Sequence, residues 1–117
     1  MAEPSIFSKI VSGEIPATIR YQDDTFLAFD DIAPKAPVHV LLITKKEYPT
    51  LEDVPTDNES LHGQLLLTAR KIAQELGIAQ NYKLHMNIGQ DVQAVSHLHM
   101  HILGGWKQAS PEETVKL

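Results

Sequence analysis

Residues 97–103 read His-Leu-His-Met-His-Ile-Leu, so histidine alternates with apolar side chains over most of the segment. Successive side chains of a β-strand point to opposite faces, so the pattern predicts a strand that buries its apolar residues and aligns its histidines on the other face. The apolar residues are Leu98, Met100 and Ile102, and the histidines are His97, His99 and His101. Neighbouring imidazoles in such a row lie ~6.5–7 Å apart. The chain therefore requires a sheet with one face in a hydrophobic core.

The rest of the chain provides partners for that strand. Two β-prone runs flank the turn pair Asp23-Asp24 and predict a hairpin. Apolar residues at helical spacing predict one long helix ended by Gly77, and Ser5 can cap a short helix ended by Gly13. The expected elements are a helix over 6–11, strands over 18–22, 25–29 and 38–44, a long helix from 57 or 58 to 76, and strands over 82–88 and 97–103. Together they predict an α+β fold with a five-stranded, mainly antiparallel sheet, one long helix and one short helix.

Size and composition limit the classes of protein. We expect 117 residues to form a single domain, 1–117, with a core over about 5–105 and a polar tail over 106–117. The absence of cysteine excludes disulfides, thiolate metal sites and a cysteine nucleophile. A net charge of −5 disfavours a nucleic-acid groove binder, and the apolar runs are too short to cross a membrane. We expect a cytoplasmic protein with neither nucleic acid nor membrane as a partner.

A row of three histidines on one face of a strand has three possible interpretations. It can be the polar face of a half-buried strand that happens to use histidine. It can bind a metal such as zinc, because alternate strand histidines can share one ion with a third ligand. It can also act without metal, with one imidazole as a nucleophile and its neighbours holding its tautomer and binding an oxyanion.

Several motifs together resemble the histidine triad (HIT) family. The densest motif runs from Asn87-x-Gly89 through Gln93-x-Val95 and the three histidines to Leu103-Gly104-Gly105. Four shorter motifs precede it in the order found in the Hint branch of that family: Ile6-Phe7-x-Lys9-Ile10, Glu14-Ile15-Pro16-Ala17, Phe29-x-Asp31-Ile32-x-Pro34 and Ala36-Pro37-x-His39. The resemblance spans about residues 5–105 and is strongest to the purine nucleoside phosphoramidases.

The resemblance implies a hydrolase that cleaves the P–N bond of purine nucleoside 5′-phosphoramidates and releases AMP or GMP through a covalent nucleotidyl-histidine. It implies no cofactor. The matching positions make His99 the nucleophile, His101 a phosphate ligand, and His97 and His39 supports of the site. Asp31 matches the carboxylate that receives the ribose hydroxyls. The base cleft matches Phe7, Ile10, Ile15, Phe29 and Ile32, while Asn87, Gln93 and Ala94 match positions beside the α-phosphate and the leaving group.

The same resemblance implies a fold of the HIT type and a homodimer whose seam is formed by strand 82–88 and the long helix. We expect no structural zinc and no other metal. Many bacterial relatives bind zinc through two cysteines and two histidines, but here Ser5, Ser8 and Glu47 stand at three of those positions. A neutral serine hydroxyl is a poor substitute for a thiolate ligand.

Alternatives remain open at the level of function and of single residues. A metal-binding protein, a nucleotide-binding interaction module with little turnover, and a dinucleoside polyphosphate hydrolase are the rivals. Ala94 favours the interaction module, because relatives often carry Ser or Thr there as a donor to the phosphate or leaving group. The other candidate site residues also have a purely structural interpretation. The apolar cleft residues can be ordinary core residues, Asp31 can be the carboxylate of a turn, and His39 can be a buried histidine of the core. His85 can border either the site or the dimer seam.

Overall fold

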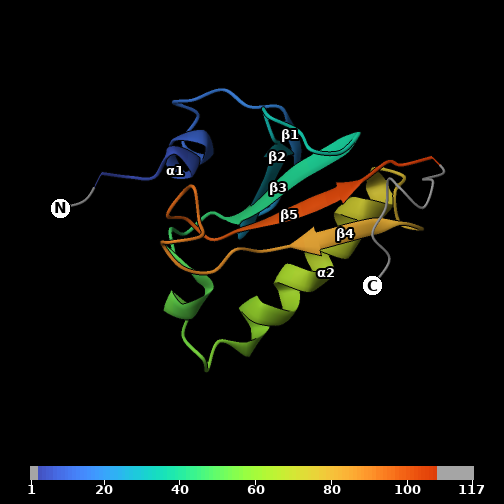
Figure 1. Ribbon diagram of the computed structural model, residues 1–117. Helices are drawn as coiled ribbons and strands as arrows, with labels where there is room; N and C mark the ends of the chain where they lie inside the picture. The colour runs from blue at the N-terminus through green and yellow to red at the C-terminus, as the bar shows by residue number, and fades with distance from the viewer. Residues whose placement is uncertain (1–2, 108–117) are drawn as a thin grey trace.

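A single five-stranded antiparallel sheet organises the protein (Figure 1). The computed structural model describes residues 3–107, so the expected tail lies outside the described residues from position 108 onward. The strands are β1 (Ile19–Gln22), β2 (Phe26–Asp30), β3 (Val38–Thr44), β4 (Tyr82–His85) and β5 (His99–Gly104), in the sheet order β1-β2-β3-β5-β4. The helices are α1 (Ile6–Val11), α2 (Glu59–Glu75) and the short 3-10 turn η1 (Leu51–Asp53). The predicted α+β class, the sheet and both helices are confirmed.

The helix ends are set by the residues that the sequence pattern indicated. The side chain of Ser5 accepts a hydrogen bond from the backbone N–H of Ser8 and caps α1. Asn58 caps α2 by accepting from the backbone N–H of Leu61. The chain leaves α2 at Gly77, whose φ of +74° is costly for any residue with a Cβ atom.

The hairpin between β1 and β2 closes on a local side-chain turn. The carboxylate of Asp23 accepts hydrogen bonds from the backbone N–H groups of Thr25 and Phe26. Such Asx contacts reproduce the geometry of a backbone turn, which explains why this pair of aspartates joins two strands. The predicted hairpin is confirmed, with a register irregularity between Ile19 and Tyr21.

The two faces of the sheet carry different cores. The face packed on α2 holds the larger cluster, which includes Phe26, Ala28, Val40, Leu42, Leu98, Met100 and Ile102. The opposite face, on the side where α1 lies, holds a smaller cluster of Phe7, Leu27, Phe29, Leu41 and Ile43 (Figure 1). In β3 and β5, Leu41 pairs with His101 and Ile43 with His99. Directly opposite residues share a face, so both histidines lie on the α1 side.

Two strand boundaries differ from the prediction. We expected a strand over 82–88, but β4 ends at His85 and residues 86–88 already belong to the next loop. Gly89 in that loop has a φ of +120°, which no extended strand has. We expected a strand over 97–103, but β5 begins at His99. His97 donates its backbone N–H to Val95, and Leu98 donates to Tyr48, so neither amide takes part in the sheet ladder.

Among the helices of residues 3–107, none is long and apolar enough to cross a membrane.

Candidate functional site

The three alternating histidines line up beside helix α1. The ring of Phe7 contacts the rings of His97 and His99 edge-on, with centroid distances of 5.8 and 5.1 Å. His97 and His99 are buried and His101 is half-buried. The apolar residues between them are buried in the core on the α2 side, as the alternation predicts. One short helix therefore covers the start of the histidine row.

Both ring nitrogens of His97 have hydrogen-bond partners. Nε2 lies 2.7 Å from the backbone carbonyl of Thr44, and Nδ1 lies 2.6 Å from the hydroxyl of Ser5. A carbonyl oxygen only accepts, so the proton of His97 is on Nε2 and the Ser5 hydroxyl donates to Nδ1. Burial lowers the pKa of His97, which keeps this imidazole neutral.

His99 has one nitrogen fixed by the backbone. Its Nδ1 lies 2.7 Å from the backbone carbonyl of His97, so Nδ1 carries the proton and Nε2 keeps its lone pair. Among residues 3–107, no group forms a hydrogen bond with that Nε2. A neutral imidazole held in one tautomer, with an uncommitted lone pair, is suited to nucleophilic attack.

His39 and His101 form a second pair with a defined direction. The backbone N–H of Lys35 donates to Nδ1 of His39, so Nε2–H of His39 donates across 2.8 Å to Nδ1 of His101. The proton of His101 is then on Nε2. Burial and the neighbouring imidazoles of His99, His39 and His85 lower the pKa of His101 to about 4. Near neutral pH, His101 is therefore an uncharged hydrogen-bond donor.

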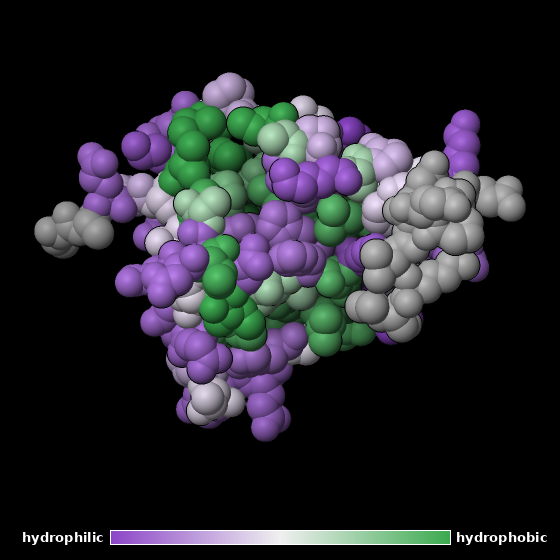
Figure 2. All heavy atoms as spheres, in the orientation of Figure 1, coloured by the Kyte–Doolittle hydropathy of each residue, from purple (hydrophilic) through white to green (hydrophobic). Residues whose placement is uncertain are grey.

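A cavity of about 320 Å³ opens beside His99 and His101. Figure 2 shows hydrophobic side chains bordering a hollow next to α1. Of the residues that the sequence assigns to substrate binding, the cavity is lined by Phe7, Ile10, Ile15, Phe29, Ile32, Asp31 and Ala94. Ile6, Pro16, Ala17, Asp30, Leu41 and Val95 also line it and were not predicted. Four of these six residues stand in the sequence motifs, so a signal for them was present: Ile6, Pro16, Ala17 and Val95.

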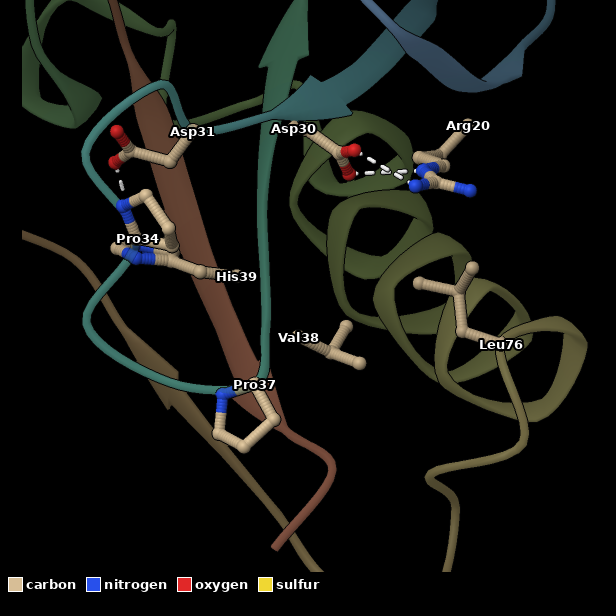
Figure 3. Close-up of a pocket in the computed structure, with 8 residues that line it drawn as sticks. All are labelled: Arg20, Asp30, Asp31, Pro34, Pro37, Val38, His39 and Leu76. Atoms are coloured by element: carbon tan, nitrogen blue, oxygen red, sulfur yellow. Dashed lines mark hydrogen bonds and ion pairs between the residues drawn. The ribbon is translucent and has the colours of Figure 1, made fainter.

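Asp31 marks the polar end of this cavity. Its carboxylate lies 3.4 Å from Nε2 of His39 and accepts the backbone N–H of Ala33. The preceding residue, Asp30, instead makes a two-pronged contact with Arg20 at 2.8 and 2.7 Å. Figure 3 shows the two carboxylates pointing apart, with Asp31 on the side of His39. Asp31 is a turn carboxylate and also a carboxylate beside the histidines, so the two interpretations of this residue are compatible.

Asn87 and Gln93 do not line the cavity, although the resemblance places them beside the phosphate. The side-chain carbonyl of Gln93 accepts from Gly89, and its amide donates to the carbonyls of Pro49 and Val95. Gln93 therefore braces the loop that leads into His97. The side chain of Asn87 contacts Nε2 of His85 at 2.9 Å.

His85 was left open by the sequence, and the structure places it next to the histidines. It pairs directly with His101 across β4 and β5, and their ring centroids are 5.2 Å apart. Gly104, the last residue of β5, and Gly105 lie at the other end of the strand from His99. A Cβ atom on Gly104 would meet Ile78 at 2.8 Å, so this glycine is required for packing and does not open space beside the histidines.

Two groups of side chains are relevant to metal binding. Asp31, His39 and His101 bring one ligand atom each within 4.8 Å of one another, a set that a divalent cation could use. The 2.8 Å contact between the two rings is, however, an ordinary hydrogen-bond length. The positions that the resemblance matched to a zinc site also come together: Ser5 bonds His97, and Ser8 donates its hydroxyl to Glu47.

Comparison with known proteins extends over most of the chain. The model of the HIT domain family matches residues 12–108. A purine nucleoside phosphoramidase of Escherichia coli is 49% identical over 107 residues, which are 90% of this chain and 90% of that protein. An uncharacterized HIT-like protein of Synechocystis is 54% identical over 106 residues, which cover 90% of this chain and 93% of that protein.

The fold matches solved structures of the same group. The crystal structure of a HIT family hydrolase from Legionella pneumophila superimposes with a TM-score of 0.83 and 42% sequence identity. The match covers 92% of this chain and 98% of that chain. Sequence and fold therefore agree along nearly the whole length.

Proposed function

Because this chain belongs to the HIT domain family, whose relatives include hydrolases, we propose that it hydrolyses the P–N bond of purine nucleoside 5′-phosphoramidates. The products are a nucleoside monophosphate, AMP or GMP, and an amine. The observation that carries the proposal is the bond from Nδ1 of His99 to the carbonyl of His97. It leaves the lone pair of Nε2 available in a residue that lines an apolar cavity. The relative named as a purine nucleoside phosphoramidase supports the choice of substrate.

Hydrolysis proceeds in two displacements at the α-phosphorus. In the first, Nε2 of His99 forms a bond to phosphorus, the P–N bond breaks, and the departing nitrogen keeps the electron pair and takes up a proton from water. In the second, a water molecule attacks the phosphorus and gives up a proton to the solvent, and Nε2 of His99 leaves with its electron pair. This proton replaces the one that the departing nitrogen took from water. Nε2–H of His101 donates to a phosphoryl oxygen in both steps, and electrostatic stabilisation of this kind typically supplies a large part of the acceleration.

Substrate recognition is divided between the cavity and one carboxylate. The apolar walls, among them Phe7, Ile10, Phe29 and Ile32, accept the purine ring. Asp31 accepts the ribose hydroxyls while its other contacts hold it beside His39. Because His99 lines the same cavity, a nucleotide bound there can present its α-phosphate to the nucleophile. No step of this scheme requires a metal ion.

The direct test is incubation with adenosine 5′-phosphoramidate and measurement of AMP. The wild-type protein is expected to release AMP, and His99→Asn is expected to bind the nucleotide but lose ~10⁴–10⁶ in kcat, as is typical when a nucleophile is removed. Rapid quenching followed by peptide mapping should locate the nucleotidyl adduct on His99. Turnover by His99→Asn, or an adduct on His97 or His101, would contradict the assignment.

Parallel assays separate the rival functions. An assay with a dinucleoside polyphosphate in place of the phosphoramidate tests whether the protein is a dinucleoside polyphosphate hydrolase. Tight AMP binding without turnover of either substrate would identify an interaction module, for which Ala94, with no hydroxyl to offer the leaving group, is the favouring observation. Dialysis against a chelator should leave the rate unchanged, whereas loss of activity that zinc restores would assign a metal to Asp31, His39 and His101.

A further inference from the structure

We infer that Ser5, the residue that caps α1, is a positioning residue for the nucleophile at the other end of the chain. Its hydroxyl holds the ring of His97, and the carbonyl of His97 holds the ring of His99. This inference rests on the proposed function, because it assigns Ser5 a part in presenting His99 to the substrate. Ser5 itself does not line the cavity, so it acts only through His97.

The series of hydrogen bonds from Ser8 through Ser5 to His97 can have only one donor–acceptor direction. The backbone N–H of Ser8 donates to Oγ of Ser5 at 2.9 Å, which leaves the Ser5 hydroxyl to donate its own proton. That proton goes to Nδ1 of His97 at 2.6 Å, because the opposite nitrogen must donate to the carbonyl of Thr44. The imidazole of His97 is thereby held at both ends and cannot turn about its ring axis.

Ser5 is in turn fixed to the segment that follows β3. Oε1 of Glu47 accepts the backbone N–H of Ser5 at 2.7 Å and the hydroxyl of Ser8 at 2.6 Å. These bonds also lower the pKa of the Glu47 carboxyl, with the Ser8 hydroxyl as the main cause, so Glu47 stays ionised as an acceptor. The first turn of α1 is thus attached both to Glu47 and to His97.

Loss of the Ser5 hydroxyl has a specific consequence at His97. In Ser5→Ala, Nδ1 of His97 becomes a buried acceptor without a donor, because the exposed fraction of this residue is 0%. The ring can then rotate, or take up a proton and turn toward the carboxylate of Glu47. Either change disturbs the bond from Nε2 to the carbonyl of Thr44 that anchors residue 97, so the residue can shift together with the backbone carbonyl that fixes the tautomer of His99. Ser5→Thr retains the hydroxyl and should retain the link.

The test combines kinetics with imidazole ¹⁵N NMR on the full chain. For Ser5→Ala we expect kcat for adenosine 5′-phosphoramidate to fall about 3- to 30-fold, while KM changes by no more than about 2-fold. The expected loss of kcat lies between the loss caused by removing one hydrogen bond and the loss caused by a misplaced nucleophile. The ¹⁵N signals should show Nε2–H on His97 and Nδ1–H on His99 in the wild type, and a changed protonation of His97 in Ser5→Ala. Ser5→Thr should restore both kcat and the spectrum.

Asn58→Ala is the matched control. It removes the equivalent N-cap bond from α2, so it should lower the melting temperature comparably while leaving kcat and the His97 signals as in the wild type. Wild-type kcat and NMR signals in folded Ser5→Ala would overturn the inference, as would an equal loss of kcat in Asn58→Ala. If the wild type does not hydrolyse the phosphoramidate, the proposed function fails, but the NMR comparison still tests the Ser5–His97 link.

Discussion

Backbone groups decide which nitrogen carries the proton in His39, His97 and His99. Carbonyl oxygens of Thr44 and His97 face Nε2 of His97 and Nδ1 of His99, and the amide of Lys35 faces Nδ1 of His39. Backbone groups cannot change their donor or acceptor character, so each fixes the protonation of the nitrogen that it faces, and the Ser5 hydroxyl holds the opposite nitrogen of His97. The tautomer of His99, the proposed nucleophile, is therefore fixed before substrate binds.

Asp31→Ala should weaken substrate use without abolishing the chemistry. A carboxylate that accepts ribose hydroxyls makes charge-assisted bonds worth about 1.5–3 kcal/mol, so kcat/KM should fall roughly 10- to 150-fold. Asp30→Ala is the control, since Asp30 is directed to Arg20, and its effect should be much smaller. A 2′,3′-dideoxy substrate should be poor for the wild type but no worse for Asp31→Ala. An additive loss would place Asp31 away from the ribose.

Stability should decrease on mild acidification because of His101. An unfolded histidine titrates near pH 6.5, whereas the pKa of folded His101 is about 4. Between those values the unfolded chain binds more protons, so the free energy of unfolding falls as the pH falls through this window. Burial lowers the pKa of His39 and of His97, which acts in the same direction. In urea titrations, the free energy of unfolding of His101→Asn should depend less steeply on pH than that of the wild type. The same dependence on pH in both proteins would refute the assignment to His101.

At the scale of elements, β5 connects the site to the core. Its first residue is the proposed nucleophile, its middle pairs with β3 and β4, and its last residue, Gly104, packs against the segment after α2. His99 pairs with Ile43 of β3 on one side, and the pairing of β5 with β4 begins two residues later at His101. The proposed nucleophile therefore stands at the point where the sheet ladder begins.

Gly104→Ala should lower stability without changing the chemistry at the opposite end of β5. The added Cβ atom would lie 2.8 Å from Cδ1 of Ile78 and 3.3 Å from the carbonyl of Asn81, and the backbone carbonyl cannot easily move away. We expect a loss of about 1–3 kcal/mol in the free energy of unfolding by denaturation, with kcat/KM retained.

Gly63→Ala is the matched substitution. Gly63 lies within α2 with nothing within 4 Å of the added Cβ atom. Alanine at this position should raise the free energy of unfolding by about 0.5–1 kcal/mol, because it lowers the conformational entropy of the unfolded chain and has a higher helix propensity than glycine. Equal effects of the two substitutions would exclude packing against Ile78 as the cause.

At the scale of the whole molecule, we propose that the protein forms a homodimer through β4 and α2. β4 is an edge strand of the sheet, and Leu84 on it is 37% exposed. Leu66 and Leu67 of α2 are also exposed large apolar residues. An unpaired edge beside apolar side chains is a surface that a second copy of the chain can cover.

Light scattering at micromolar concentration should give twice the mass of the chain. Leu84→Lys should produce a monomer, since a charge would be buried in the seam. Ile19→Lys on β1, the opposite edge strand, is the control, because Ile19 is 41% exposed but lies far from the proposed seam. The reverse pattern would place the seam at β1, and a monomeric wild type would reject the dimer.

The sequence by itself determined the elements and the faces of the sheet. Caps at Ser5 and Asn58 and the turn at Asp23-Asp24 are local, so their effects follow from neighbouring residues. The alternation around His99 likewise fixes which side chains face the core, because a one-residue slip would bury the histidines' face instead. The motifs also sufficed to identify the family.

Only the tertiary structure decided how those residues act. His97 lies outside the strand because its amide bonds Val95, and Gln93 braces a loop because the carbonyl of Pro49 lies within its reach. The link between Ser5 and His97 joins residues 92 positions apart, and no local pattern encodes such a contact. Histidine tautomers depend on which backbone group faces each nitrogen, and packing of distant segments sets that arrangement.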